Sequence, residues 1–260
     1  MRNIWTIARK ELSSYFRSPI AYSVLAVFAL IFGYFFFTVL SMFLFQSLTQ
    51  ATYAQMYGGE MPPMNVNEMV IRPLLLNTGV VCLFLVPMIT MRLFAEEKKV
   101  GTIELLMTSP ITDVQAVLGK FFGALLLYAA MLALTFFYMI ILFRYGQPDW
   151  RPLVAGYLGQ LLLGCCFLSL GLLFSTFTRS QVIAGSLTFF ALLLLWIIDW
   201  TSQYSSGLWS QLANYLSLTS HIQNFSKGVI DLKDTVYYLS VIALGLFLSV
   251  RSVESVRWRA

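Results

Sequence analysis

The chain has 260 residues, of which 58% are hydrophobic and 11% charged, and its mean hydropathy is +0.76. Soluble proteins carry about 25% charged residues, so this composition excludes a soluble domain. The net charge of +5 comes from basic residues that are dispersed rather than clustered, which argues against nucleic acid as a partner. We expect one all-α integral membrane domain over residues 1–260, in contact with the lipid bilayer.

Residues 1–19 have the pattern of an amphipathic helix. Apolar side chains recur at helical spacing on one face, and basic and hydroxyl side chains fall on the other; the two sets are Ile4, Trp5, Ala8, Leu12, Tyr15 and Phe16, and Arg2, Thr6, Arg9, Ser13 and Arg17. Such a helix is suited to the lipid headgroup layer. Pro19 is expected to end it and turn the chain into the bilayer.

Six apolar segments follow, and each is near the roughly 20 residues that cross about 30 Å of hydrocarbon. They are residues 20–45, 73–91, 121–143, 153–177, 182–198 and 235–250. Trp196, Trp200, Tyr237 and Tyr238 supply interfacial anchors for the two shortest segments. The sequence therefore predicts a six-span bundle over residues 20–251, which places both termini on one side of the membrane.

The basic residues show which side that is. Twelve of the 17 lie on the side of the termini: Arg2, Arg9, Lys10, Arg17, Arg92, Lys98, Lys99, Lys120, Arg179, Arg251, Arg257 and Arg259. The other five are Arg72, Arg144, Arg151, Lys227 and Lys233. The positive-inside rule then predicts that both termini, including a tail over residues 252–260, are cytoplasmic.

The six segments, as bounded here, contain no Asp, Glu, Lys, Arg or His. This absence argues against a transporter coupled to protons through side chains, and against an intramembrane hydrolase. The three cysteines fall in apolar runs without disulfide or zinc spacing, so they are expected in the core. His221, the only histidine, is expected to be an interfacial hydrogen-bonding residue.

Small residues mark the helix contacts. Gly119 and Gly123 form a pair at the start of the third span. One stripe of the fourth span carries Gly156, Gln160, Gly164, Gly171 and Ser175. Small residues let helix backbones approach closely, and a buried Gln can bond across helices. The stripe predicts tight packing within the subunit; a subunit or pathway interface remains the alternative.

Two loops are expected on the outer side. Residues 46–72 contain one Gly-Gly pair and one Pro-Pro pair and are expected to be irregular. Met56, Met61, Met64 and Met69 in this loop are interpreted as membrane-facing filler, with Cu(I) binding as a weaker alternative. Residues 199–234 predict two short amphipathic helices, around Leu208, Leu212 and Tyr215 and around Ile222, Phe225 and Val229. Asp231 or Asp234 is placed to cap the sixth span.

Residues 96–112, EEKKVGTIELLMTSPIT, form the most charged interruption between two spans. The second span is expected to continue as a helix through residues 92–99 and to stop at Gly101. Thr102 would then cap a short helix over residues 103–107, and Thr112 with Gln115 would form a capping box for the third span. Because the inner leaflet is anionic, an acidic segment fits a protein groove better than a lipid surface.

This segment resembles the signature of ABC-2-type transporter permeases. The matching residues are Glu96, Gly101, Thr102, Glu104, Leu105, Leu106, Ser109, Pro110, Ile111, Thr112, Gly119 and Lys120. The outer segment is similar to permeases associated with gliding motility, through Leu218, His221, Ile222, Phe225, Gly228, Val229, Ile230, Asp231, Asp234 and Tyr237. The resemblance covers nearly the whole chain.

The resemblance implies a non-enzymatic permease subunit of an ATP-binding-cassette exporter in the bacterial inner membrane. Residues 1–19, with Arg9, Lys10 and Glu11, would be the connecting helix. The coupling region would contact a separate ATP-binding subunit or set the geometry of that contact, through Glu96, Glu97, Gly101, Thr102, Glu104, Leu105, Leu106 and Pro110.

The resemblance also implies a second permease subunit, identical or different. The chain contains no GxxxxGK[ST] motif, so ATP and Mg²⁺ are expected on the partner, with no cofactor or metal on this chain. The alternative function is a membrane scaffold that transmits ATPase motion to a periplasmic auxiliary protein without moving cargo. A membrane-embedded enzyme lacks any catalytic constellation in the sequence.

Overall fold

The computed structural model describes residues 2–57, 64–104, 110–204, 215 and 217–257, and within these ranges every regular element is a helix. The elements are α1 (Arg2–Arg17), α2 (Pro19–Tyr57), the π-helical turn η1 (Asn67–Ile71), α3 (Arg72–Thr90), α4 (Ala95–Val100), α6 (Asp113–Tyr145), α7 (Trp150–Phe177), α8 (Gln181–Tyr204), α10 (Leu218–Ser226) and α11 (Leu232–Arg257). Six of the described helices are long and apolar enough to cross a membrane. The predicted all-α, six-span fold is confirmed.

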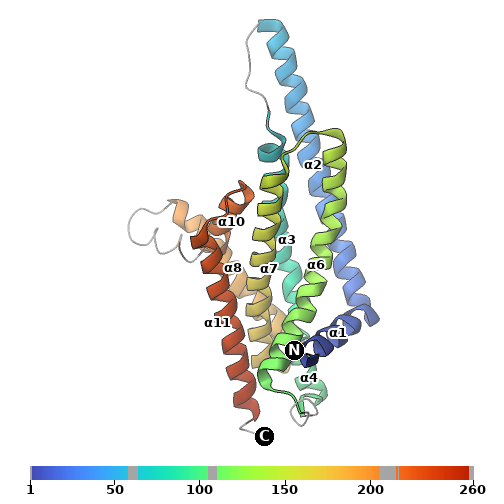
Figure 1. Ribbon diagram of the computed structural model, residues 1–260, viewed down its shortest axis with the longest axis vertical. Helices are drawn as coiled ribbons and strands as arrows, with labels where there is room; N and C mark the ends of the chain where they lie inside the picture. The colour runs from blue at the N-terminus through green and yellow to red at the C-terminus, as the bar shows by residue number, and fades with distance from the viewer. Residues whose placement is uncertain (1, 58–63, 105–109, 205–214, 216, 258–260) are drawn as a thin grey trace.

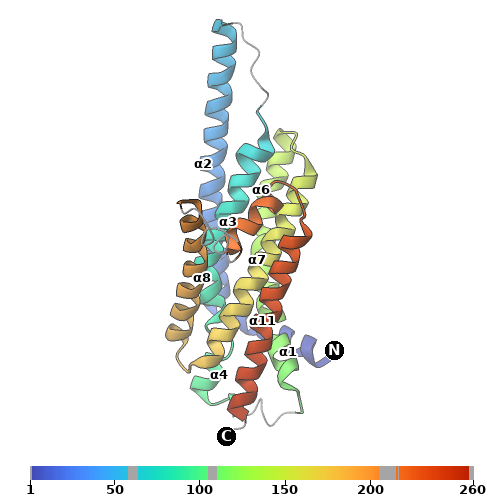
Figure 2. The ribbon, with the colours of Figure 1, turned by 90° about the vertical axis from the view of Figure 1, so that its left-hand side faces the viewer.

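Helix α7 is the centre of the bundle, with α3, α6, α8, α10 and α11 packed around it. Figures 1 and 2 show both chain ends at the same end of the molecule. We call this end the terminal face; it holds α1, α4, the start of α6 and the end of α7. The opposite face holds the end of α2, η1, the α6–α7 connection and α10.

The small-residue stripe of α7 lies inside the subunit. A Cβ on Gly156 would meet Leu75 at 2.3 Å, and one on Gly171 would meet Thr90 at 2.3 Å. At Gly164 the ring of Tyr128 would be 2.1 Å away. The stripe thus lets α3 and α6 approach the α7 backbone closely, and all of its members are buried.

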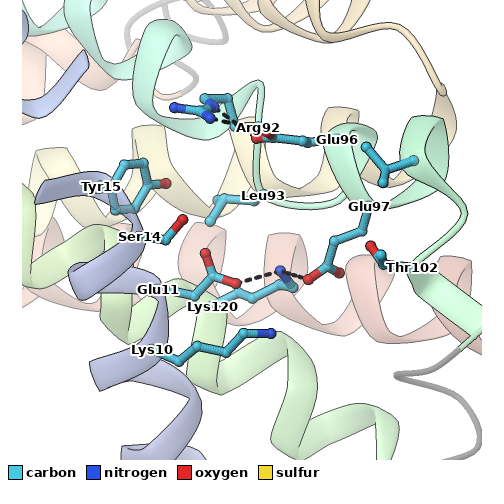
Figure 3. A pocket seen from close by; sticks show the side chains of 11 residues that line it. Lys10, Glu11, Ser14, Tyr15, Arg92, Leu93, Glu96, Glu97, Thr102 and Lys120 are labelled. Atoms are coloured by element: carbon cyan, nitrogen blue, oxygen red, sulfur yellow. Dashed lines mark hydrogen bonds and ion pairs between the residues drawn. The ribbon is translucent and has the colours of Figure 1, made fainter. Parts of the chain in front are cut away.

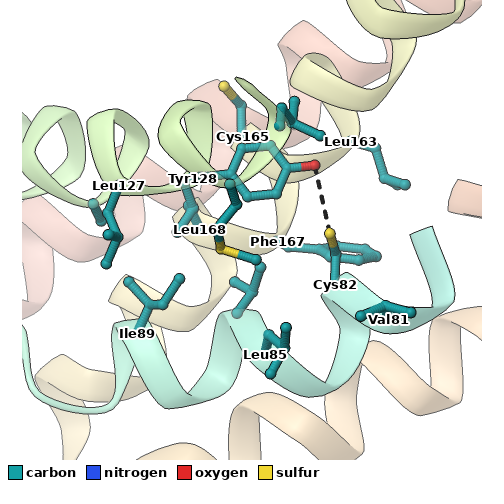
Figure 4. Packing of buried hydrophobic residues seen from close by; sticks show 14 of the residues in the cluster. Val81, Cys82, Leu85, Ile89, Leu127, Tyr128, Leu163, Cys165, Phe167 and Leu168 are labelled. Atoms are coloured by element: carbon teal, nitrogen blue, oxygen red, sulfur yellow. Dashed lines mark hydrogen bonds between the residues drawn. The ribbon is translucent and has the colours of Figure 1, made fainter. Parts of the chain in front are cut away.

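Polar bonds connect these three helices within the apolar core (Figure 4). The hydroxyl of Tyr128 on α6 donates to the Gln160 carbonyl on α7 at 2.9 Å, and Cys82 Sγ on α3 lies 3.8 Å from that hydroxyl. The Gln160 amide donates to the Leu75 carbonyl on α3. The three cysteines are buried and free, as the sequence predicts.

The prediction of an irregular loop over residues 46–72 is wrong for its first part, because α2 continues to Tyr57. Gly and Pro are absent from residues 46–57, so nothing in that stretch ends the helix. At 1.5 Å per residue a helix of 39 residues is about 58 Å long, far more than the roughly 30 Å of hydrocarbon. The end of α2 accordingly projects beyond the rest of the bundle (Figure 1).

Of the two outer helices predicted within residues 199–234, α10 contains Ile222 and Phe225. The one centred on Leu208 and Leu212 lies outside the described residues. Asp231 caps α11, since its carboxylate accepts from the Lys233 amide at 3.0 Å. Its neighbour Asp234 instead binds His221 at 2.6 Å.

His221 forms hydrogen bonds as expected, and its ring is buried in the protein, stacked on Tyr237 of α11. Met61, one of the four methionines considered for Cu(I), falls among the residues the structure does not describe.

We predict that Gly164→Ala lowers the stability of the folded protein by about 1–3 kcal/mol, the usual cost of overpacking a core. Tyr128 cannot retreat easily, because its hydroxyl is bonded to α7. The matched control is Gly185→Ala, whose Cβ would lie 3.4 Å from Met91. Thermal unfolding in detergent measures both, and equal melting temperatures for the two variants would contradict the close approach at Gly164.

Candidate functional site at the terminal face

Helix α1 packs directly on the start of α6. A Cβ on Gly119 would come 2.6 Å from Ile7, and one on Gly123 would come 2.6 Å from Glu11. The two glycines therefore let α1 lie against the α6 backbone. The contacting face of α1 includes Ile7 and Glu11, whereas Trp5 of the predicted apolar face is 62% exposed. Of the predicted apolar face, Ala8 and Tyr15 are buried in the protein, whereas Trp5 remains available to the lipid headgroup layer.

The central group of the site is Lys120 of α6, whose side chain is 2% exposed. Its ammonium lies 2.6 Å from a carboxylate oxygen of Glu11 on α1 and 2.8 Å from one of Glu97 on α4. The ring of Phe94 lies 5.1 Å from the same nitrogen. One buried cation therefore joins two surface helices to a membrane-spanning helix (Figure 3).

Helix α6 begins at Asp113, directly after the predicted capping box at Thr112. Lys120 therefore lies within this helix, one residue before the apolar segment predicted to cross the membrane. The statement that the spans carry no ionisable residue holds only for the shorter predicted bounds. Sequence reasoning had a signal for Lys120, because it belongs to the Gly119-Lys120 pair of the permease signature.

A second ion pair lies beside the first. Arg92 donates to Glu96 through two nitrogens, at 2.7 and 3.0 Å, and to the hydroxyl of Ser18 at 3.1 Å. Ser18 stands between α1 and α2, so Arg92 connects this junction to the start of α4. The Tyr15 hydroxyl of α1 donates to the Ile89 carbonyl of α3 at 2.9 Å. Burial is the main cause that raises the Tyr15 pKa, which keeps this hydroxyl protonated as a donor.

The prediction that the second span runs unbroken through residues 92–99 is wrong. Helix α3 ends at Thr90, and α4 starts anew at Ala95. The Ser175 hydroxyl of α7 accepts from the amides of Phe94 and Ala95, at 3.0 and 3.1 Å, and so satisfies the start of α4. At its other end, the Lys98 ammonium donates to the Thr176 carbonyl of α7.

Gly101 ends α4 as predicted, in the left-handed conformation with φ of 83°. Ile103 and Glu104 are helical, which agrees with the start of the predicted short helix, but Leu105 and Leu106 lie outside the described residues. The capping box of Thr112 and Gln115 is present at the start of α6. Its amide–hydroxyl bond is 3.3 Å long.

The predicted contact residues divide into two groups. Gly101, Thr102, Glu104, Pro110, Arg9 and Lys10 are exposed at the terminal face. Glu96, Glu97 and Glu11 are instead engaged in the ion pairs, with side-chain exposures of 37%, 18% and 15%. The second Glu97 oxygen is buried without a hydrogen-bond partner in the described part of the chain.

A cavity of about 240 Å³ lies between α1 and α4, and its lining contains both ion pairs (Figure 3). The charged groups around it are Lys10, Arg92 and Lys120 and the three glutamates Glu11, Glu96 and Glu97. No nucleophile with an adjacent base stands among the residues that line it. The ion pairs of Lys120 join helices from distant parts of the chain. They are suited to holding these helices in position and not to catalysing a reaction.

The fold and this site define a multi-pass membrane protein with an ion-paired helical surface at one face. The family model described as ABC-2 family transporter protein matches residues 5–251, so the chain belongs to the ABC-2 transporter family. A search of curated proteins found no match. Membership implies pairing with an ATP-binding subunit, and membrane components of this family are generally non-catalytic.

We predict that Lys120→Met destabilises the folded protein by about 3–5 kcal/mol, because two largely buried carboxylates lose their cation. The variant Lys120→Met with Glu11→Gln and Glu97→Gln removes those charges as well and should recover most of the loss. Thermal unfolding in detergent gives the comparison. A triple variant no more stable than Lys120→Met would show that uncompensated charge is not the cause.

Proposed function

We propose that this chain is the permease subunit of an ATP-driven exporter, and that a separate ATP-hydrolysing subunit binds its terminal face. The distribution of basic residues supports a cytoplasmic terminal face, in a bacterial inner membrane. The partner supplies ATP and Mg²⁺, and two permease subunits pair with two ATPases. Family membership supports the general assignment.

The observation that carries the proposal is the burial of Lys120 between Glu11 and Glu97. Helix α4 and Gly101 immediately precede the exposed segment around Glu104, and α1 flanks the same cavity. Since Lys120 belongs to α6, a displacement of either surface helix is delivered to a membrane-spanning helix. A permease whose motion is driven by a separate ATP-hydrolysing subunit requires such a connection.

The exposed residues are the proposed contacts with the ATPase: Gly101, Thr102, Glu104 and Pro110 in the coupling region, and Arg9 and Lys10 on the connecting helix α1. Leu105 and Leu106 complete the coupling region in this proposal. The ion pairs at this face have a positioning role in the proposal, since they hold α1 and α4 in place through Glu11, Glu96 and Glu97. The contact surface and its internal support are thus separate sets of residues.

A second candidate is a scaffold that transmits ATPase motion to a periplasmic partner without moving cargo. The length of α2 favours it, since this helix projects well beyond the bundle at the opposite face (Figure 1). Reconstitution with the ATPase in sealed vesicles separates the candidates. ATP-dependent accumulation of a defined substrate supports the exporter, whereas ATPase stimulation by a periplasmic partner without accumulation supports the scaffold.

We predict that Glu104→Arg weakens binding of the ATPase subunit about tenfold, roughly 1.4 kcal/mol, because it reverses an exposed charge in the contact surface. Membrane insertion and thermal stability should remain unchanged, since Glu104 is exposed. Pull-down titration of the ATPase and its stimulated ATP hydrolysis are the measurements.

The control for this variant is Gln55→Arg, which introduces the same charge at an exposed position of α2 on the opposite face. It should bind the ATPase as the unchanged protein does. If Glu104→Arg also binds and stimulates normally, the proposed contact role of this residue is wrong.

A further inference from the structure

A polar cavity of about 250 Å³ lies at the opposite face, between the start of α3, the start of α7 and the end of α10. Four charged residues line it, together with amide and hydroxyl side chains; the charged residues are Glu68, Arg72, Asp149 and Lys227. This cavity is remote from the ion pairs of the terminal face. Nothing in the proposed coupling function uses it.

The walls of the cavity are held together by specific contacts. Asn67 of η1 donates to the Asp149 carbonyl at 2.9 Å, and the Asp149 amide donates back to the Asn67 side chain at 3.0 Å. Gly228, with φ of 87°, packs so closely on Pro152 that a Cβ would lie 2.9 Å from its Cα. This contact brings Lys227, at the end of α10, beside the start of α7. The π-helical turn is itself a rare geometry that is frequent at functional sites.

Arg72 carries the buried donor of this cavity that lacks a protein partner. Its Nε is buried and has no hydrogen-bond partner in the part of the chain that the structure describes. A guanidinium remains charged and carries only donors, so this N–H needs an acceptor. Lys227, at the end of α10, also lines the cavity and supplies a second cation. A guanidinium and an ammonium that line one cavity suit a phosphate group.

The two carboxylates narrow the choice of ligand. Glu68 and Asp149 line the same cavity, and none of the four charged residues forms an ion pair within the described chain. A ligand with only negative charge would be repelled by both carboxylates. A ligand that carries a phosphate and a nearby ammonium satisfies both signs of charge.

The position of the cavity indicates where such a ligand comes from. Tyr145, at the end of α6, and Trp150, at the start of α7, are 88% and 61% exposed. Exposed Tyr and Trp at the ends of spanning helices mark the level of the lipid headgroups. Gln147 and Asp149, which line the cavity, lie in the connection between these two helix ends. The cavity is therefore at the level from which a lipid headgroup of the surrounding leaflet reaches it.

We propose that this cavity binds the headgroup of a phosphoethanolamine lipid, with the phosphate on Arg72 and Lys227 and the primary ammonium on Glu68. Asp149 already accepts from the Arg151 amide at 3.3 Å, which leaves Glu68 as the main ammonium partner. A bound lipid of this kind would join η1, α7 and α10 at the opposite face.

The test measures lipid retention by the full-length protein, purified in detergent, by native mass spectrometry. Short-chain phosphatidylethanolamine, phosphatidylglycerol, phosphatidylcholine and free phosphoethanolamine are the probes. We expect phosphatidylethanolamine to bind about tenfold more tightly than the other three, roughly 1.4 kcal/mol. Phosphatidylglycerol lacks the ammonium, and the quaternary ammonium of phosphatidylcholine cannot donate to Glu68.

Three variants assign the groups. Arg72→Gln and Lys227→Gln should each lower phosphatidylethanolamine binding about tenfold. Glu68→Gln should remove the preference for phosphatidylethanolamine over phosphatidylglycerol. The matched control is Arg144→Gln, an exposed cation at the end of α6 that does not line the cavity and should retain lipid fully. Lys227 is exposed, so its variant reports on lipid binding even if Arg72→Gln lowers the stability or yield of the folded protein.

Equal retention by Lys227→Gln and Arg144→Gln would overturn the site. Equal binding of phosphatidylethanolamine and phosphatidylglycerol would overturn the recognition of the ammonium. Free phosphoethanolamine that binds as tightly as the lipid would overturn the lipid as its source. All three readouts are independent of ATPase binding, so failure here is distinguishable from failure of the proposed coupling function.

Discussion

The burial of the Lys120 ammonium is the interaction on which the terminal face depends. Moving such a charge from water into a medium of low dielectric costs on the order of 20 kcal/mol by an ideal estimate, so it requires close partners. Glu11 and Glu97 provide them, and they come from two helices outside the span that carries the lysine. The electrostatic need of one residue therefore fixes the positions of α1 and α4 against α6.

The rest of the surface supports this arrangement through shorter contacts. Gly119 and Gly123 bring α1 close enough to α6 for Glu11 to reach Lys120. Ser175, near the end of α7, satisfies the first amides of α4 and so allows that helix to begin at a sharp turn. The central helix α7 consequently touches the surface as well as the core. Motion at α4 has two physical routes into the bundle, through Lys120 to α6 and through Ser175 to α7.

The two faces use charge in different ways. At the terminal face the buried or half-buried charges are paired within the chain, which suits elements that must move together. At the opposite face Arg72, Lys227, Glu68 and Asp149 share a cavity without ion pairs among the described residues. A protein surface that leaves such groups unpaired is suited to a ligand from outside. The proposed coupling region and the proposed lipid site thus lie at opposite faces of the molecule.

The features that the sequence by itself determined are those set within a few residues of the chain. Six apolar segments, the helix stop at Gly101 and the capping box at Thr112 depend on local composition and local hydrogen bonds, and the structure confirms them. The prediction of an irregular loop over residues 46–72 failed for residues 46–57, because the Gly-Gly and Pro-Pro pairs on which it rested all lie after residue 57. The charge count still stands as a prediction about the side of the membrane.

Only the tertiary structure determined which charged and polar residues are buried and with which partners they pair. Lys120 and Glu11 are separated by 109 positions, and Ser175 lies 81 positions from the amide of Phe94 that it caps. No periodicity shows such pairs, since Glu11 looks locally like a surface residue of an amphipathic helix and Ser175 like a member of the small-residue stripe. Arg72 likewise has the sequence context of an interfacial cation, and only the folded structure shows that its Nε is buried without a partner in the described chain, beside a cavity lined by residues of α7 and α10. Local patterns fix helices, whereas the cost of burying charge is settled by which helices pack together.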